Sequence, residues 1–172
     1  MNAIIENLLT RRSTRAFLSK KIPDDQLKAI LQTAIYAPSG MGKQTWKFTV
    51  LCNPEKIQQL AEIIGRKLGR QGYDMYHPQV LIIPSNQKDN PHGMEDNACA
   101  LENIFLAAHS FGIGSVWINQ LRTLCDDPEV RSLLDEFNIP SDHVVYGMAA
   151  LGYPAEVPKK EIHKIGEIQI IS

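Results

Sequence analysis

Three arginines and a hydroxyl side chain stand close together near the start of the chain, where residues 11–15 read Arg-Arg-Ser-Thr-Arg. A guanidinium group presents a fork of N–H donors that matches a pair of phosphate oxygens. If residues 13–17 are extended, side chains alternate in direction, so Arg11, Ser13 and Arg15 point to one side and Arg12 to the other. This pattern favours a ligand with a phosphate at one end and a polar ring edge at the other. The alternative is a set of solvated charges between a helix and a strand.

Two glycine-containing segments could expose backbone N–H groups to a ligand. Residues 37–46 read Ala-Pro-Ser-Gly-Met-Gly-Lys-Gln-Thr-Trp, and residues 112–117 read Gly-Ile-Gly-Ser-Val-Trp. Glycine adopts positive φ readily, which lets the backbone approach a flat molecule. Both segments also fit ordinary turns between a helix and a strand. Neither matches Gly-x-Gly-x-x-Gly after a strand or a P-loop, so a dinucleotide held in a Rossmann crevice has no support.

Other catalytic chemistries find little support in the residue pattern. The five histidines are scattered, and the chain has neither a His-x-x-x-His nor a Cys-x-x-Cys pair, so we expect no metal site. His109 lies in an apolar helical stretch and is expected to be a hydrogen-bonded structural histidine. Ser39 lacks the Gly-x-Ser-x-Gly setting of a hydrolytic nucleophile.

Composition narrows the class of protein. The chain has 172 residues, enough for one domain, and its 18 basic and 19 acidic residues give a formal charge of -1. This balance provides no broad positive field for nucleic acid or an anionic membrane. No segment reaches the roughly 20 apolar residues that span a bilayer, and the first residues do not read as a signal peptide. We therefore expect a cytoplasmic protein, with its three cysteines buried and reduced.

The elements that must position these residues alternate along the chain. Apolar residues at helical spacing predict helices near residues 4–9, 24–35, 54–68, 94–111 and 128–137, with Asp24, Asn53 and Asp127 as caps. Strands are predicted at residues 48–52, 80–83, 115–118 and 144–151. Residues 168–171 form an apolar piece that could pair with a sheet edge of this chain or of a partner. Periodicity alone does not distinguish an α/β from an α+β arrangement.

Five motifs in series resemble the nitroreductase family over almost the whole chain. They are residues 11–15, 22–27, 37–46, 106–118 and 151–156. The resemblance implies an α+β fold with a central, mostly antiparallel mixed sheet enclosed by helices. It also implies an intertwined homodimer with FMN at the subunit interface. We expect residues 1–172 to form one FMN-binding domain, with residues 154–172 as a C-terminal extension that packs on the partner subunit.

The same resemblance implies which residues contact FMN. Arg11, Arg12 and Ser13 would hold the phosphate and ribityl chain, and Arg15 would face the pyrimidine edge of the ring. The full set comprises these four residues together with Pro38, Ser39, Gly40, Gln44, Trp117, Ile118, Asn119, Lys159 and Lys160. Residues 38–40 would come from the partner subunit, the backbone of residues 117–119 would pass the reactive nitrogen, and one of the two lysines would meet the phosphate.

The chain departs from the family pattern at two positions in the first loop, where Gly42 and Thr45 replace the usual Asn and Pro. It also has little room after residue 68 or residue 119 for the extra helix of larger members. The resemblance therefore implies an open, shallow substrate face.

The implied activity is an FMN-dependent transfer of hydride from NADH or NADPH to a nitroaromatic, quinone or similar acceptor, with ping-pong kinetics. No acid or base side chain is required, and Arg15 would stabilise the negative charge that reduction leaves on the ring edge. Two alternatives stay open. Ferredoxin or another electron carrier could be the donor, because no nicotinamide-binding motif is visible, or the chain could bind flavin without catalysis.

Overall fold

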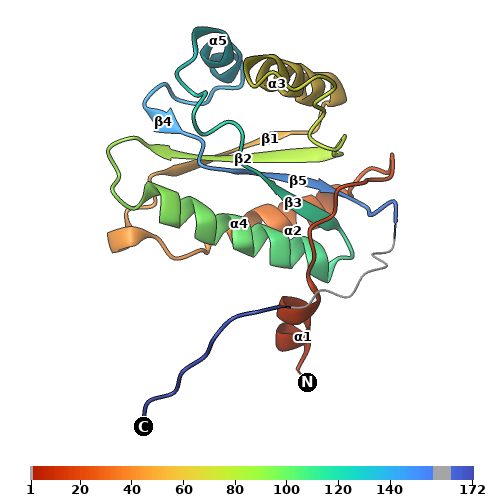
Figure 1. Ribbon diagram of the computed structural model, residues 1–172, viewed down its shortest axis with the longest axis vertical. Coiled ribbons are helices and arrows are strands. Elements are labelled where there is room, and N and C mark those ends of the chain that lie inside the picture. Colours follow the sequence, from red (N-terminus) through yellow and green to blue (C-terminus); the bar gives the residue numbers. More distant parts are fainter. Residues whose placement is uncertain (1, 157–163) are drawn as a thin grey trace.

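An antiparallel sheet lies between two layers of helices in the computed structural model, which describes residues 2–156 and 164–172 (Figure 1). Within these residues the strand order is β1-β2-β5-β3, and β4 pairs with the end of β2. The strands are β1 (Trp46–Leu51), β2 (Val80–Gln87), β3 (Gly114–Ile118), β4 (His143–Val144) and β5 (Met148–Gly152). The helices are α1 (Ala3–Thr10), α2 (Asp24–Ile35), α3 (Pro54–Lys67), α4 (Gly93–Ser110) and α5 (Pro128–Glu136), with a short 3-10 turn, η1, at Gly40–Gly42.

Both faces of the sheet are buried, which explains the continuous apolar run in β2. Ile82 packs with residues of α2 and α4, whereas Leu81 and Ile83 pack with residues of α3 and α5 on the opposite face. Alternate side chains of a strand point to opposite faces, and burying each one contributes roughly 1.5–3 kcal/mol. The predicted α+β fold, a mostly antiparallel sheet enclosed by helices, is confirmed. Among the described residues, the named strands pair only in the antiparallel sense.

Two of the three predicted helix caps are confirmed. Asn53 Oδ1 accepts a hydrogen bond from the Glu55 N–H at 2.8 Å, and Asp127 Oδ1 does the same for Glu129 at 3.0 Å. The prediction for Asp24 is wrong. The N-cap of α2 is Pro23, without a side-chain cap, and Asp24 is the first helical residue, where a carboxylate complements the helix dipole.

The last predicted strand is interrupted at residues 145–147. β4 and β5 both pair with β2, through Asn86–Val144 and Ile82–Ala149 respectively. Between these two pairs, β2 advances by four residues, from Ile82 to Asn86, whereas the segment that carries β4 and β5 advances by five, from Val144 to Ala149. The extra residue forms an irregularity of the bulge type, and such sites redirect nearby side chains.

The prediction that all three cysteines are buried is wrong for two of them. Cys52 and Cys99 are exposed, and only Cys125 is buried. Cys52 follows the last residue of β1, and Cys99 lies on an outward-facing position of α4. All three are free thiols, and burial raises the pKa of Cys125.

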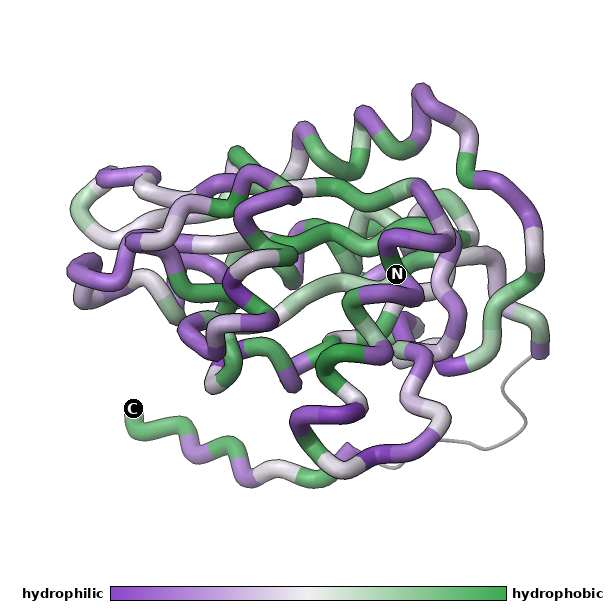
Figure 2. Tube along the Cα trace, turned by 90° about the horizontal axis from the view of Figure 1, so that it is seen from above, coloured by the Kyte–Doolittle hydropathy of each residue, from purple (hydrophilic) through white to green (hydrophobic). Residues whose placement is uncertain are grey.

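The first helix and the last residues make few contacts with the sheet. α1 has no buried residue and is tied to α4 by a hydrogen bond from Asn7 Nδ2 to the Leu106 carbonyl at 2.9 Å. Residues 164–172 extend away from the body, and the side chains of Ile165 and Ile168 are 98% and 92% exposed. Figure 2 shows the apolar residues of this tail standing apart from the rest. In the described part of the chain the tail pairs with no strand of its own sheet.

None of the helices in residues 2–156 and 164–172 combines the length and the apolar character needed to cross a bilayer.

Candidate functional site

The arginine-rich segment runs beside the outer edge of β3. Ser13 forms a parallel bridge with Ser115, and the Thr14 N–H donates to the Ser115 carbonyl at 2.8 Å. Gly114 makes this approach possible, since a β-carbon at that position would lie 2.5 Å from the Thr14 hydroxyl oxygen. The sheet therefore fixes the backbone that carries the predicted phosphate-binding side chains.

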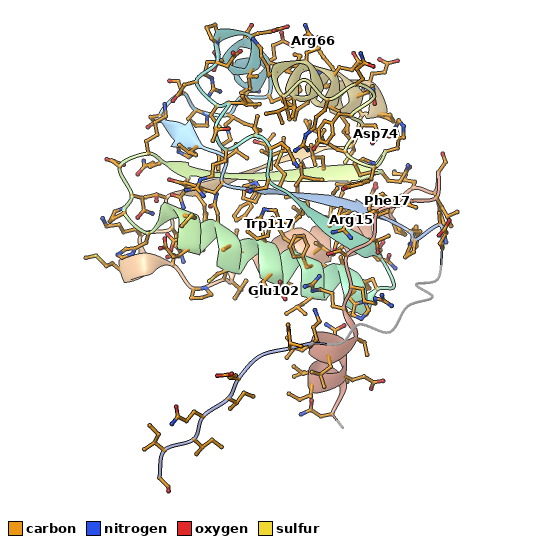
Figure 3. The ribbon with its side chains drawn as sticks, viewed as in Figure 1. Arg15, Phe17, Arg66, Asp74, Glu102 and Trp117 are labelled. Carbon is orange, nitrogen blue, oxygen red and sulfur yellow. The ribbon has the colours of Figure 1, made fainter. Side chains whose placement is uncertain are left out.

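Arg11 turns toward α4. Its Nε lies 3.6 Å from Glu102 Oε1, and its guanidinium carbon is 5.6 Å from the centre of the Phe105 ring. Phe105 in turn packs against Trp117 of β3, with ring centres 6.1 Å apart and planes tilted by 54°. Figure 3 shows Trp117 between the sheet and α4, with Glu102 on that helix. The Arg11 guanidinium and the Trp117 indole are thus linked through buried Phe105, which contacts both.

Arg12 and Thr14 line a cavity of about 280 Å³ together with His109, Gly112 and Pro154. Ser13 and Arg15 do not line this cavity, as expected if side chains alternate along an extended segment. Arg11 departs from the expected alternation, because it contacts Glu102 and also lines this cavity.

Ser13 and Arg15 are exposed beside this cluster. Over residues 2–156 and 164–172 neither side chain has a hydrogen-bond or ion-pair partner. Figure 3 shows Arg15 near Phe17, at the end of the sheet. A hydroxyl and a guanidinium group are therefore available to a ligand on the outside of the segment.

His109 is a structural residue, as predicted. Its Nε2 lies 2.8 Å from Thr10 Oγ1, which ties the end of α1 to α4. Burial lowers the pKa of His109, and the nearby charge of Arg11 lowers it further. The imidazole is therefore biased toward its neutral form beside the arginine segment.

The predicted ring-facing residues lie at the end of β3 and just after it. Trp117 is 39% exposed, and its indole passes over Gly147, where a β-carbon would come within 2.6 Å of the ring. Ile118 is 2% exposed, so it can offer only its backbone to a ligand. The Asn119 N–H donates to the side-chain oxygen of Gln120 at 3.0 Å.

Sequence reasoning did not identify Gln120 and Tyr73 as parts of this region. The Tyr73 hydroxyl donates to the same Gln120 oxygen at 3.0 Å, and burial raises the pKa of Tyr73 to about 12. A ligand that accepts from the Asn119 amide would have to replace Gln120 there. Tyr73 and Gln120 are far apart in sequence, and no motif joins them.

The predicted loop at residues 38–44 lies elsewhere in the same chain. The Gly40 N–H donates to Asp96 Oδ1 at 2.7 Å, whereas Arg11 contacts Phe105, nine residues further along α4. At 1.5 Å per residue this separation is roughly 14 Å along the helix axis. Figure 1 shows the loop and the arginine segment at opposite ends of α4. Lys159 and Lys160 lie outside the described residues.

The chain matches the family model described as Nitroreductase family over residues 8–153. It is similar over its whole length to a crystal structure of a nitroreductase with bound FMN from Bacteroides fragilis. The two sequences are 44% identical, each chain is fully covered, and the TM-score is 0.94.

Curated relatives carry more than one activity. The chain is 44% identical to an iodotyrosine deiodinase from Haliscomenobacter hydrossis, with 85% of this chain and 77% of that protein covered. It is 29% identical to an NADPH-flavin oxidoreductase from Vibrio harveyi, with 92% and 69% covered. The family match spans the arginine segment, the sheet and the end of β3 that carries Trp117 and Ile118, and the chain belongs to the nitroreductase family.

Proposed function

We propose that this chain is an FMN-dependent oxidoreductase that accepts hydride from NADH or NADPH. The electrons pass to a small acceptor such as a nitroaromatic or a quinone. The observation that carries the proposal is the group of guanidinium and hydroxyl donors fixed along β3, next to the half-exposed Trp117. The similar Bacteroides fragilis nitroreductase has bound FMN, and the Vibrio harveyi relative is an NADPH-flavin oxidoreductase.

The chemistry of the donor set fits FMN. Arg11, Arg12 and Ser13 would hold the phosphate and ribityl chain, because charge-assisted forks suit phosphate oxygens. The cavity of about 280 Å³ lined by Arg11 and Arg12 offers space next to these two guanidinium groups. Trp117 and the backbone of residues 118–119 would lie along the ring. Gly147 leaves room for the indole there.

When bound, FMN supplies a ring that takes up hydride and releases electrons. Arg15 would place a fixed positive charge at the pyrimidine edge, where negative charge would develop on reduction. The Asn119 amide would exchange its Gln120 partner for a ring nitrogen and so orient the ring. The proposal requires no side chain to act as an acid or a base, because the protein binds and orients the reacting groups.

A second copy of the chain would complete the site. Residues 38–40 lie at the far end of α4 from Arg11, so within one protomer they do not surround the same point as the arginine segment. The exposed isoleucines of the tail and the exposed Ile4 and Leu9 of α1 form apolar surfaces of the kind that subunits cover. We therefore propose a homodimer in which the tail packs on the partner and residues 38–40 and Gln44 contact the partner's FMN. Lys159 or Lys160 would reach the phosphate.

Light scattering after size exclusion tests this assembly. The full chain should elute at twice the mass of one chain, and a variant truncated after residue 163 should shift toward the monomer and lose FMN. A monomeric full chain that retains FMN would contradict the proposed interface.

The test of the activity is an absorbance spectrum of the purified protein without oxygen, before and after addition of NADH and then NADPH. A flavin spectrum that bleaches supports both the cofactor and the donor. A bound flavin that stays oxidised with both nicotinamides would instead favour ferredoxin or another carrier. Failure to bind FMN on reconstitution would overturn the proposal.

The order of substrates is tested separately. If donor and acceptor occupy the same open position over the ring in turn, initial rates should give parallel lines in a double-reciprocal plot. Intersecting lines would exclude ping-pong kinetics. A bound flavin that no donor can reduce would favour a flavin-binding protein without turnover.

A further inference from the structure

The loop of residues 38–45, called here the glycine loop, has an unusual backbone. Met41, Gly42 and Gln44 have φ values of 56°, 66° and 50°. The left-handed region is unfavourable for methionine and glutamine, and it persists only where the surroundings impose it. Met41 is 83% exposed, so packing of its side chain does not hold this conformation.

Hydrogen bonds hold the two ends of the glycine loop instead. At its start, the Gly40 N–H donates to Asp96 Oδ1 at 2.7 Å. At its end, the Thr45 hydroxyl donates to Asn86 Oδ1 at 2.6 Å and accepts from Asn90 Nδ2 at 2.8 Å. Within the residues that the structure describes, the other hydrogen bonds of residues 39–44 remain inside the loop.

The two anchors belong to one connected network. Asn90 Nδ2 also donates to Asp96 Oδ2 at 3.1 Å, and Asn90 Oδ1 accepts from the backbone of His92, the N-cap of α4, at 3.0 Å. Asn86, Asn90 and Asp96 are 0%, 6% and 3% exposed. Because these groups are buried, losing one partner leaves others unsatisfied.

The backbone of the loop also packs tightly at its first anchor. A β-carbon at Gly40 would lie 2.5 Å from the ring of His92. The loop start is therefore fixed against the first turn of α4 by both contact and hydrogen bonding, and its end is fixed against β2.

We infer that the buried network of Thr45, Asn86, Asn90 and Asp96 fixes the strained glycine loop in the conformation that meets FMN. In this view Thr45 and Asp96 are positioning residues. They do not touch the cofactor, but they determine where the backbone amides of the loop point. The inference rests on the proposed function, since it assumes that the loop contacts FMN.

The test is Thr45→Val, which keeps the shape of the side chain and removes its hydroxyl. Thr49→Val is the matched control, because Thr49 lies on β1, directly after the glycine loop, and its buried hydroxyl has no hydrogen-bond partner in the described structure. The dissociation constant of FMN is measured by flavin fluorescence, and the setting of the ring by visible circular dichroism of the bound flavin.

We expect Thr45→Val to weaken FMN binding by about tenfold and to change the circular dichroism of the bound flavin. Thr49→Val should alter neither. Thr45→Ser, which restores the hydroxyl, should return both values toward those of the unmodified protein. This rescue would not be seen if residue 45 acted only through its bulk.

Asp96→Asn provides a second route if Thr45→Val does not fold. This variant keeps an oxygen that accepts from the Gly40 N–H, but it places an NH₂ group opposite the Asn90 Nδ2, so two donors face each other. It should therefore weaken FMN binding in the same way. If the unmodified protein binds FMN and the Thr45 or Asp96 variant binds it equally well with an unchanged spectrum, the inference is wrong. If the unmodified protein does not bind FMN, the proposed function itself fails.

Discussion

Trp117 of β3 and Gly147, the residue just before β5, are matched in shape. Gly147 lies between β4 and β5, in the segment that has one residue more than the part of β2 it runs beside. The indole of Trp117 occupies the space that a side chain at Gly147 would fill. The position of the exposed indole is therefore set by a residue thirty positions further along the chain.

Gly147→Ala should displace the indole, because the added carbon would come within 2.6 Å of it. Overpacking of this kind costs about 1–3 kcal/mol, and we expect FMN affinity to fall by roughly tenfold. Titration with FMN followed by flavin fluorescence measures this change. Gly69→Ala is the control, since it also introduces strain, through a backbone φ of 64°, but lies just after α3, where a β-carbon meets no atom within 4 Å. Equal affinities in the two variants would remove Trp117 from the proposed site.

Arg15→Ala should weaken FMN binding by about tenfold to a hundredfold, because a hydrogen bond to a charged group contributes roughly 1.5–3 kcal/mol. It should also make the flavin harder to reduce, which spectroelectrochemical titration would record as a more negative midpoint potential. Arg66→Ala is a suitable comparison. Arg66 lies on α3, across the sheet, and pairs with Glu129. A potential that is the same in both variants would argue against a role for Arg15 in stabilising the reduced ring.

Asn53→Ala should destabilise the fold without affecting the cofactor. Asn53 caps α3 through the backbone N–H groups of Glu55 and Lys56, and losing such a cap costs about 1 kcal/mol. Urea unfolding of the protein without FMN should show this loss. α3 lies on the face of the sheet opposite α4, so the FMN dissociation constant should be unchanged. A large loss of affinity would show that the two faces are coupled.

Stability should fall below pH 6.5 in part because of His143. Its Nδ1 lies 3.0 Å from Ser85 Oγ, and burial lowers its pKa from the ordinary 6.5, with Asp142 opposing and Lys47 adding to the effect. The unfolded chain then binds the proton more readily, so stability is complete above pH 6.5 and is lost as the pH falls through the lowered pKa. Urea unfolding from about pH 8 to about pH 5 should show a shallower decline in His143→Gln. Identical declines would assign the effect to other groups.

Sequence patterns predicted those parts of the fold that depend on local interactions. The Asn-Pro and Asp-Pro starts of α3 and α5 combine a cap with a first-turn proline, so they were predictable from adjacent residues. Asp24 shows the limit of this reasoning, because a carboxylate also suits the first turn of a helix, next to a cap of another type.

A candidate site could be proposed from the sequence where one segment carries its donors, as with residues 11–15, and the contacts of these residues with FMN stay a prediction. The site was not predictable where distant residues meet. The sequence showed Thr45 only as a departure from the family pattern, whereas its hydroxyl contacts Asn86, forty-one residues away. Gln120 and Tyr73 likewise meet through folding alone. Exposure of Cys52 and Cys99 depends on which side of an element faces outward, and composition does not contain that information.

The arginine segment also covers one edge of the sheet, at β3. β3 is the last strand in the order β1-β2-β5-β3, and residues 13–14 pair with its open side at Ser115. Further along the segment, the Leu18 N–H donates to the Tyr153 carbonyl, just after β5. Without this cover, β3 would present unpaired backbone groups to other molecules. Loss of the segment by proteolysis or truncation would therefore remove the proposed anchor of the cofactor. The same cut would expose the backbone of β3 to pairing with other chains, so loss of activity would be accompanied by aggregation.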